Sequence, residues 1–230
     1  MAQSAYTVTQ LDESTWALDE GLVRSYLLVG EEKALLIDTG NGAGDLPAEV
    51  RALTALPVML VNTHADGDHM ACNEAFDCAW LHPSEFDRYE KRYPNHPHAP
   101  LQDGEEIDLG GRVVRVLLIP GHTPGSIALL DVSHRQLFSG DSVSASAIFM
   151  FGEGRSLRAL CSSLKRLQAL QADYDRILPA HGPCPIEKDT VDRLLTCAQA
   201  CMAGKVEDRD PSFPVDAREY SLGGVGFFLK

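Results

Sequence analysis

The sequence is poor in basic residues and has no long apolar run. Its 230 residues hold 20 Lys and Arg against 33 Asp and Glu, a formal net charge of −13 at pH 7. Such a surface repels phosphate backbones and anionic lipid, so we expect neither nucleic acid nor a membrane as a partner. Because no apolar run approaches the roughly 20 residues that span a bilayer, we expect no transmembrane helix.

Export signals, CxxC pairs and serine-nucleophile motifs are also missing. The first fifteen residues show neither a basic start nor an apolar core, so we predict a cytoplasmic protein. Six cysteines are present, and in that compartment we expect reduced thiols rather than disulfides. The lack of CxxC argues against a structural zinc knuckle, and the lack of a G-x-S-x-G elbow argues against a serine hydrolase.

What is present is an ordinary globular composition, with 44% hydrophobic residues, arranged as two similar α/β halves. The first forty residues read as strands, and strands recur between the predicted helices. Helices are predicted over 45–56 (capped by Asp45), from 69 to 76, over 82–93 (capped at Ser84), 156–174 and 187–204, with a surface loop over 94–106 and a hairpin over 218–230. No linker separates the halves. We therefore predict one domain over residues 1–230, a four-layer αββα sandwich of two mixed β-sheets flanked by helices.

Metal-binding side chains gather in the stretch "VNTHADGDHMACNEAF" at 61–76, directly after a strand-like run. The four residues are His64, Asp66, Asp68 and His69. Taken alone, the stretch is either a loop of solvated carboxylates or one half of a metal site. If it is a site, the other ligands should lie in further loops at strand ends, where a sheet can position them.

Three more loops have this form. "IPGHTPGS" carries His122, "LFSGDSV" carries Asp141, and "ILPAHGPCP" carries His181, each directly after a predicted strand. Alone, each reads as a hydrogen-bonded histidine or a turn aspartate. Together, four strand ends that all offer imidazole or carboxylate favour a site for zinc, iron or manganese.

The set "THADGDH", "GHTPGS", "SGDS" and "PAHG", in this order and at these separations, resembles the metallo-β-lactamase-fold hydrolases. "LLIDTG" at 35–40 matches another recurring segment of that family, and the resemblance runs from Tyr6 to the terminal strand. It implies two divalent metal ions, with zinc favoured and iron or manganese as the alternatives. The implied ligands are His64 and His122 for the first metal, Asp68, His69 and His181 for the second, and Asp141 for both. Asp38 is implied to orient ligands without binding metal, although a strand-end turn also explains it.

One position departs from the family pattern. Most members carry His-x-His-x-Asp-His, whereas "HADGDH" puts Asp66 where the second histidine is expected. Three readings stay open: Asp66 is an oxygen ligand that makes the first site harder, or it points away and leaves one full metal position, or the site is a relic. The presence of every other ligand favours the first reading.

The resemblance implies an enzyme, a metallo-hydrolase. Its dinuclear site would activate a bridging hydroxide, oriented by Asp68 as the catalytic residue, for attack on a small-molecule ester, thioester, lactone or phosphoester. A glyoxalase II-like thioesterase is disfavoured, because its helical C-terminal domain needs more than the 49 residues after His181.

Two other hypotheses stay open. One is a redox di-iron protein related to the flavodiiron oxygen/NO reductase core, which carries a carboxylate at the position of Asp66. The other is a non-enzymatic protein that uses the fold alone. Phe149, Met150 and Phe151 are candidate pocket residues, with core packing as the competing reading. The sequence leaves the oligomeric state open.

Overall fold

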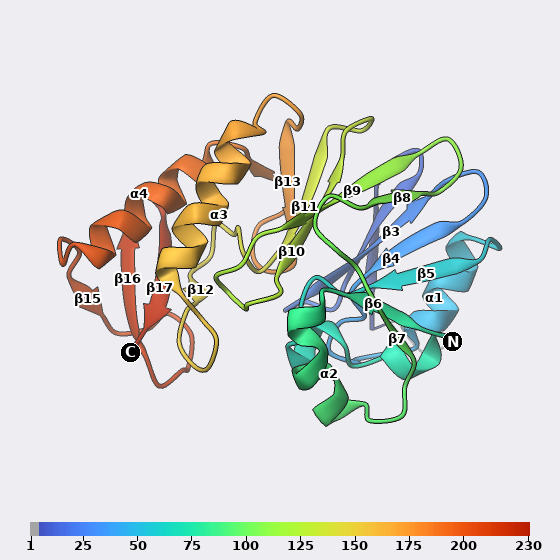
Figure 1. The fold of residues 1–230 in the computed structure, drawn as a ribbon, viewed down its shortest axis with the longest axis horizontal. Helices are drawn as coiled ribbons and strands as arrows, with labels where there is room; N and C mark the ends of the chain where they lie inside the picture. The colour runs from blue at the N-terminus through green and yellow to red at the C-terminus, as the bar shows by residue number, and fades with distance from the viewer. Residues whose placement is uncertain (1–4) are drawn as a thin grey trace. The chain divides into compact units, whose positions relative to one another are not determined.

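A computed structural model describes residues 5–230. The chain divides into two compact units, Met1–Val116 and Leu117–Lys230. Both units combine strands with helices (Figure 1). The single domain over residues 1–230 stays a prediction.

The first unit is built on a seven-stranded mixed sheet. In spatial order its strands are β1 (Thr7–Asp12), β2 (Thr15–Asp19), β3 (Arg24–Val29), β4 (Ala34–Ile37), β5 (Val58–Val61), β6 (Ala79–Leu81) and β7 (His98–Pro100). Strands β1 to β4 pair antiparallel, and β4 to β7 pair parallel. Ile37 pairs with Val61, so the residues that follow β4 and β5 leave the sheet side by side.

The rest of the first unit comprises two helices and a hairpin. The helices are α1 (Leu46–Leu53) and α2 (Phe86–Arg92), and β8 (Glu106–Asp108) pairs antiparallel with β9 (Val113–Leu118), the strand in which the unit boundary falls. Helix α1 is confirmed as predicted, because the Asp45 carboxylate accepts from the Ala48 N–H and caps it.

Two local predictions in this unit are wrong, and a third is wrong in part. Residues 69–76 do not begin an α-helix but hold the end of the 3-10 turn Gly67–His69 and the whole of the turn Asn73–Ala75, because groups from other segments satisfy their backbone, as the Asn62 amide does for the His69 carbonyl. Helix α2 is not capped at Ser84: His82 accepts from the Ser84 N–H in a preceding 3-10 turn. Part of the loop over 94–106 is strand β7, which extends the sheet by pairing with β6.

The second unit holds two groups of strands. The first, in the order β14-β13-β11-β10, comprises β10 (Ile127–Asp131), β11 (Gln136–Gly140), β13 (Arg176–Pro179) and β14 (Ile186–Glu187). The second, in the order β12-β17-β16-β15, comprises β12 (Ile148–Phe149), β15 (Asp208–Arg209), β16 (Arg218–Leu222) and β17 (Val225–Leu229). Strands β16 and β17 form the predicted C-terminal hairpin.

Helices α3 (Leu157–Ala169) and α4 (Thr190–Met202) lie side by side in the second unit (Figure 1). Both were predicted from the sequence. Helix α3 begins where Ser156 accepts from the Ala159 N–H, and it buries Leu160 and Leu164 in the core of this unit. All six cysteines are free thiols, as expected. In the described part of the chain, no helix combines the length and apolar character that crossing a bilayer requires.

Candidate metal centre

The four candidate ligands of the first unit lie together in the loop after β5. The buried rings of His64 and His69 have centroids 4.1 Å apart. A carboxylate oxygen of Asp66 lies 3.6 Å from Nε2 of His64, and one of Asp68 lies 3.9 Å from Nε2 of His69. Asp66 therefore faces Nε2 of His64, and Asp68 faces Nε2 of His69.

Buried Asp38 fixes the orientation of both rings. Its Oδ2 accepts from Nδ1–H of His69 at 2.8 Å and from the Thr63 hydroxyl at 2.7 Å, and its Oδ1 accepts from the Thr63 N–H at 2.7 Å. Because the hydroxyl gives its only proton to Asp38, it accepts from Nδ1 of His64, 3.0 Å away. In their neutral form, both rings would therefore present the lone pair at Nε2, the atom that faces the carboxylates.

Asp38 holds this position in an uncommon backbone conformation. It follows β4 directly and has a φ of 60°, in the left-handed region that side-chain-bearing residues rarely adopt. Aspartate and asparagine tolerate this region better than most residues, and such conformations concentrate at functional sites. The conformation favours a positioning role over an ordinary strand-end turn.

The three candidate ligands of the second unit also lie together. Asp141 places Oδ2 at 3.5 Å from Nε2 of His122 and Oδ1 at 3.3 Å from Nε2 of His181. Nδ1 of His122 donates to the Phe149 carbonyl at 2.9 Å, so the neutral ring presents its lone pair toward Asp141. One oxygen beside each imidazole is the arrangement that a carboxylate shared by two cations requires.

A glycine beside each of these histidines allows close packing of the loops. At Gly121, with a φ of 151°, a Cβ would lie 2.5 Å from Leu160 of α3. At Gly182, with a φ of 72°, a Cβ would lie 2.1 Å from the Ser146 hydroxyl. No other residue type fits either position without displacing its neighbour, which explains the glycines in "PGH" and "AHG".

The separations within each unit suit metal ligation. Two ligand atoms of a tetrahedral zinc, each about 2.0–2.2 Å from the metal, lie roughly 3.4 Å apart. The four carboxylate–imidazole separations range from 3.3 to 3.9 Å, longer than ordinary hydrogen bonds. Imidazole and carboxylate together suit zinc, iron and manganese. The residues present in each unit therefore fit metal ions of the kind predicted.

Sequence reasoning missed three residues that support the first loop. Thr63 directly precedes the HADGDH motif, and a hydroxyl at this position could have indicated a hydrogen bond to a ligand histidine. Arg88 of α2 donates to Oδ1 of Asp66, and buried Glu85 accepts from the Ala65 N–H at 2.9 Å. In the sequence, the last two resemble ordinary surface charges of a short helix.

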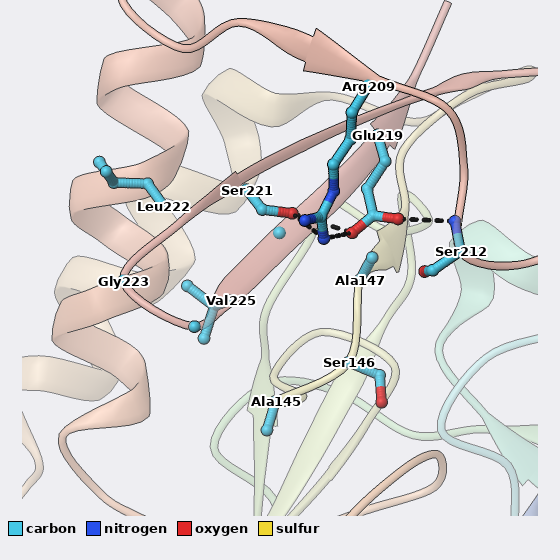
Figure 2. A pocket seen from close by; sticks show the side chains of 12 residues that line it. Ala145, Ser146, Ala147, Arg209, Ser212, Glu219, Ser221, Leu222, Gly223 and Val225 are labelled. Carbon is cyan, nitrogen blue, oxygen red and sulfur yellow. Dashed lines mark hydrogen bonds and ion pairs between the residues drawn. The ribbon is translucent and has the colours of Figure 1, made fainter.

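The second unit holds a pocket of about 390 Å³. It lies between residues 145–147 and the C-terminal strands (Figure 2). Glu219 accepts here from the Arg209 guanidinium, from the Ser212 N–H at 2.8 Å and from the Ser221 hydroxyl at 2.9 Å. Burial opposes the charge of Glu219, but these hydrogen bonds outweigh burial and lower the pKa of its carboxyl to about 2. The charged groups of this pocket hold one another in place.

The three candidate pocket residues do not line that pocket. Met150 is buried in the core of the second unit. The Phe149 ring lies 4.9 Å from that of Phe228 and 5.7 Å from that of Phe151. These contacts fit the core-packing reading, and a role in a substrate pocket stays a prediction.

Comparison with known proteins places the chain in a family. The family model described as Metallo-beta-lactamase superfamily matches residues 18–181, which include every candidate ligand. The chicken acyl-coenzyme A thioesterase MBLAC2 is 29% identical over 196 residues, 68% of this chain and 71% of that protein. The hydroxyacylglutathione hydrolase of Methylococcus capsulatus is 34% identical over 163 residues, 64% of this chain and 60% of that protein.

Solved structures show the same fold. The metallo-beta-lactamase from Pontibacter korlensis superposes with a TM-score of 0.73 at 19% identity, over 84% of this chain and 99% of that one. TTHA1623, solved in a di-iron-bound form, superposes with a TM-score of 0.62 at 30% identity, over 75% of this chain and 93% of that one. These likenesses confirm the predicted α/β fold class and enzyme class: the chain belongs to the metallo-β-lactamase superfamily and is a metallo-hydrolase.

Proposed function

We propose that the protein hydrolyses small acyl thioesters at a dinuclear metal centre. The observation that carries the proposal is Asp141, whose two oxygens each lie beside a different histidine. The substrate class is supported by the relatives, one named an acyl-coenzyme A thioesterase and another a hydroxyacylglutathione hydrolase.

The ligands are assigned as the resemblance implies. His64, Asp66 and His122 hold the first metal, Asp68, His69 and His181 hold the second, and Asp141 is shared. Zinc is the favoured metal, and iron and manganese are the alternatives. When bound there, divalent cations would supply Lewis acidity for the thioester carbonyl and would lower the pKa of water toward neutrality.

The side chains of this protein have distinct tasks in that reaction. Asp38 and Thr63 keep Nε2 of the two first-unit histidines ready to bind metal, without a change of tautomer. We assign to Asp68 the task of orienting the attacking water and accepting its proton, and the 41% exposure of its side chain, against 0% for His69, supports that assignment. The departing thiolate, with a pKa of about 8.5, leaves without a dedicated acid.

After His181 the chain forms helix α4 and a strand group that includes β15 to β17. That a glyoxalase II-like architecture is disfavoured stays a prediction. We also expect small-molecule substrates rather than nucleic acid, because the net charge is −13. The cytoplasmic location stays a prediction.

The test combines metal analysis with a substrate panel. Protein purified without added metal is measured by elemental analysis, then assayed for thiol release from acyl-coenzyme A and acylglutathione and for cleavage of an ester, a lactone and a phosphodiester. We expect two metal equivalents, thiol release that a chelator abolishes, and loss of both metals in Asp141→Asn. Asp216→Asn, at an exposed carboxylate of the same unit, is the matched control.

Two outcomes would overturn the proposal. One metal equivalent in the wild type, unchanged in Asp141→Asn, would contradict the dinuclear centre. If the protein cleaved the phosphodiester and left both thioesters unhydrolysed, the proposed substrate class would be wrong.

A redox di-iron protein is the second candidate. It is favoured by the carboxylate oxygen of Asp66 beside Nε2 of His64 and by the di-iron-bound form of the 30% identical TTHA1623. Two irons with a visible absorption band, together with no hydrolysis of any substrate in the panel, would support it against the first candidate.

A further inference from the structure

The two carboxylate oxygens of Asp66 face different partners. Oδ2 lies 3.6 Å from Nε2 of His64. Oδ1 accepts from the Arg88 guanidinium. The Asp66 side chain is 19% exposed and that of Arg88 is 33% exposed, so solvent screens this ion pair only in part. One oxygen is thereby directed to the candidate metal position, and the other is occupied by a cation.

The segment that carries Arg88 also holds the backbone next to Asp66. Glu85, three residues before Arg88, is buried and accepts from the Ala65 N–H at 2.9 Å. Two consecutive residues of the loop, Ala65 and Asp66, are thus fixed to one short helical segment, one through its backbone and one through its side chain. Oδ1 of Asp66 is therefore held by Arg88, and the backbone beside it is held by Glu85.

We propose that Arg88 is a positioning residue that makes Asp66 a one-oxygen ligand and offsets its charge. The Asp66–Arg88 pair is then the functional equivalent of the neutral histidine that the family pattern has at this position. This inference rests on the proposed function, because it takes Asp66 to be a ligand of the first metal.

The proposal has a consequence for metal preference. Hard cations such as Mn²⁺ gain from an extra oxygen contact and from carboxylate charge, whereas zinc accepts four ligands with a larger share of nitrogen. Arg88 withholds both the second oxygen and the full charge, so it biases the first site toward zinc. The direct repulsion between Arg88 and a metal ion is nearly the same for any divalent cation and cancels in a ratio of affinities.

The test measures the ratio of Mn²⁺ to Zn²⁺ affinity, without any assay of activity. Metal-free protein is dialysed against buffered mixtures of both ions, and the bound metals are counted by elemental analysis. We expect Arg88→Gln to raise the Mn²⁺/Zn²⁺ ratio of one bound equivalent about tenfold and Arg88→Lys to stay near the wild type. Lys91→Gln removes the same charge from an exposed position of α2 and serves as the matched control.

A second background separates ligand control from a general structural role. In the Asp66→His background, Arg88→Gln should leave the Mn²⁺/Zn²⁺ ratio unchanged, because this background has no carboxylate at position 66 for Arg88 to hold. An equal change in both backgrounds, or no change in either, would overturn the inference while leaving the dinuclear centre intact. If Asp66→Asn binds both metals as the wild type does, Asp66 is not a ligand, and this part of the proposed function fails together with the inference.

Discussion

The Asp38 carboxylate lies 2.8 Å from Nδ1 of His69, and these two residues lie in the segments that follow β4 and β5, the neighbouring strands of a parallel pair. The same carboxylate reaches His64 through the Thr63 hydroxyl. One buried acid therefore sets the tautomer of two candidate ligands, which leads to the first prediction.

Asp38→Asn should weaken metal binding by about 10–100-fold. Asparagine keeps the shape and tolerates the φ of 60°, so the change isolates the loss of the carboxylate charge and of one acceptor oxygen. Thr63→Val should weaken only the metal held by His64. Competitive chelator titrations that resolve two equivalents measure both effects, and equal losses at both equivalents in Thr63→Val would contradict the relay.

Gly121→Ala should destabilise the fold by about 3 kcal/mol, from backbone strain and from the added Cβ 2.5 Å from Leu160. Gly204 has a φ of 64° and open space where a Cβ would lie, so Gly204→Ala carries the strain alone and should cost about 1 kcal/mol. Urea unfolding of both variants measures the difference. Equal losses of unfolding free energy in the two variants would show that α3 shifts to make room for the added Cβ, and would contradict the prediction.

Glu219 should make stability fall in acid. Hydrogen bonds from Arg209, Ser212 and Ser221 lower its folded-state pKa from the ordinary 4.5 to about 2. A lowered pKa stabilises the fold above pH 4.5, and that contribution, up to about 3 kcal/mol, is lost as pH falls from 4.5 toward 2.

The measurement is the free energy of unfolding at several pH values. Glu219→Gln should be less stable than the wild type at pH 7 and should lose less between pH 4.5 and 2.5. Glu207→Gln, at an exposed side chain, should follow the wild-type curve. Parallel curves for the wild type and Glu219→Gln would contradict the assignment.

Asn73→Ala should cost about 1–3 kcal/mol, because it removes the partner of two buried polar groups. Asn73 accepts from the Thr39 hydroxyl at 2.6 Å and donates to the Asn62 side chain at 2.7 Å. Thermal unfolding compares this variant with Asn41→Ala, at an exposed side chain, which should lie within about 0.5 kcal/mol of the wild type. If Asn73→Ala were as stable as the wild type, water would be taking over the hydrogen bonds of the Asn73 amide, and the prediction would be wrong.

The sequence predicted most of what depends on local pattern. Asp45 and Pro47 predicted helix α1, the leucines of residues 157–170 predicted helix α3, and the strand-end motifs predicted which side chains gather within each unit. The errors occurred where distant groups replace local hydrogen bonds. Residues 69–76 are not a helix because Asn62, on another segment, binds the His69 carbonyl.

The supporting residues of the site were harder to predict for the same reason. Arg88 is 22 residues from Asp66, and no periodicity links a charge on α2 to a loop after β5. Asp38 was found only through a resemblance, since its partners Thr63 and His69 become neighbours through the parallel pairing of β4 and β5.

The parallel pairing of β4 and β5 also indicates where the chain should tolerate an insertion. The register of Ile37 against Val61 is held by the strands themselves, and the intervening segment connects them through α1. Added residues between Leu53 and Pro57 would lengthen the crossover without moving either strand end. A peptide tag or a fluorescent label can therefore be inserted at this connection while the support of both histidines is preserved.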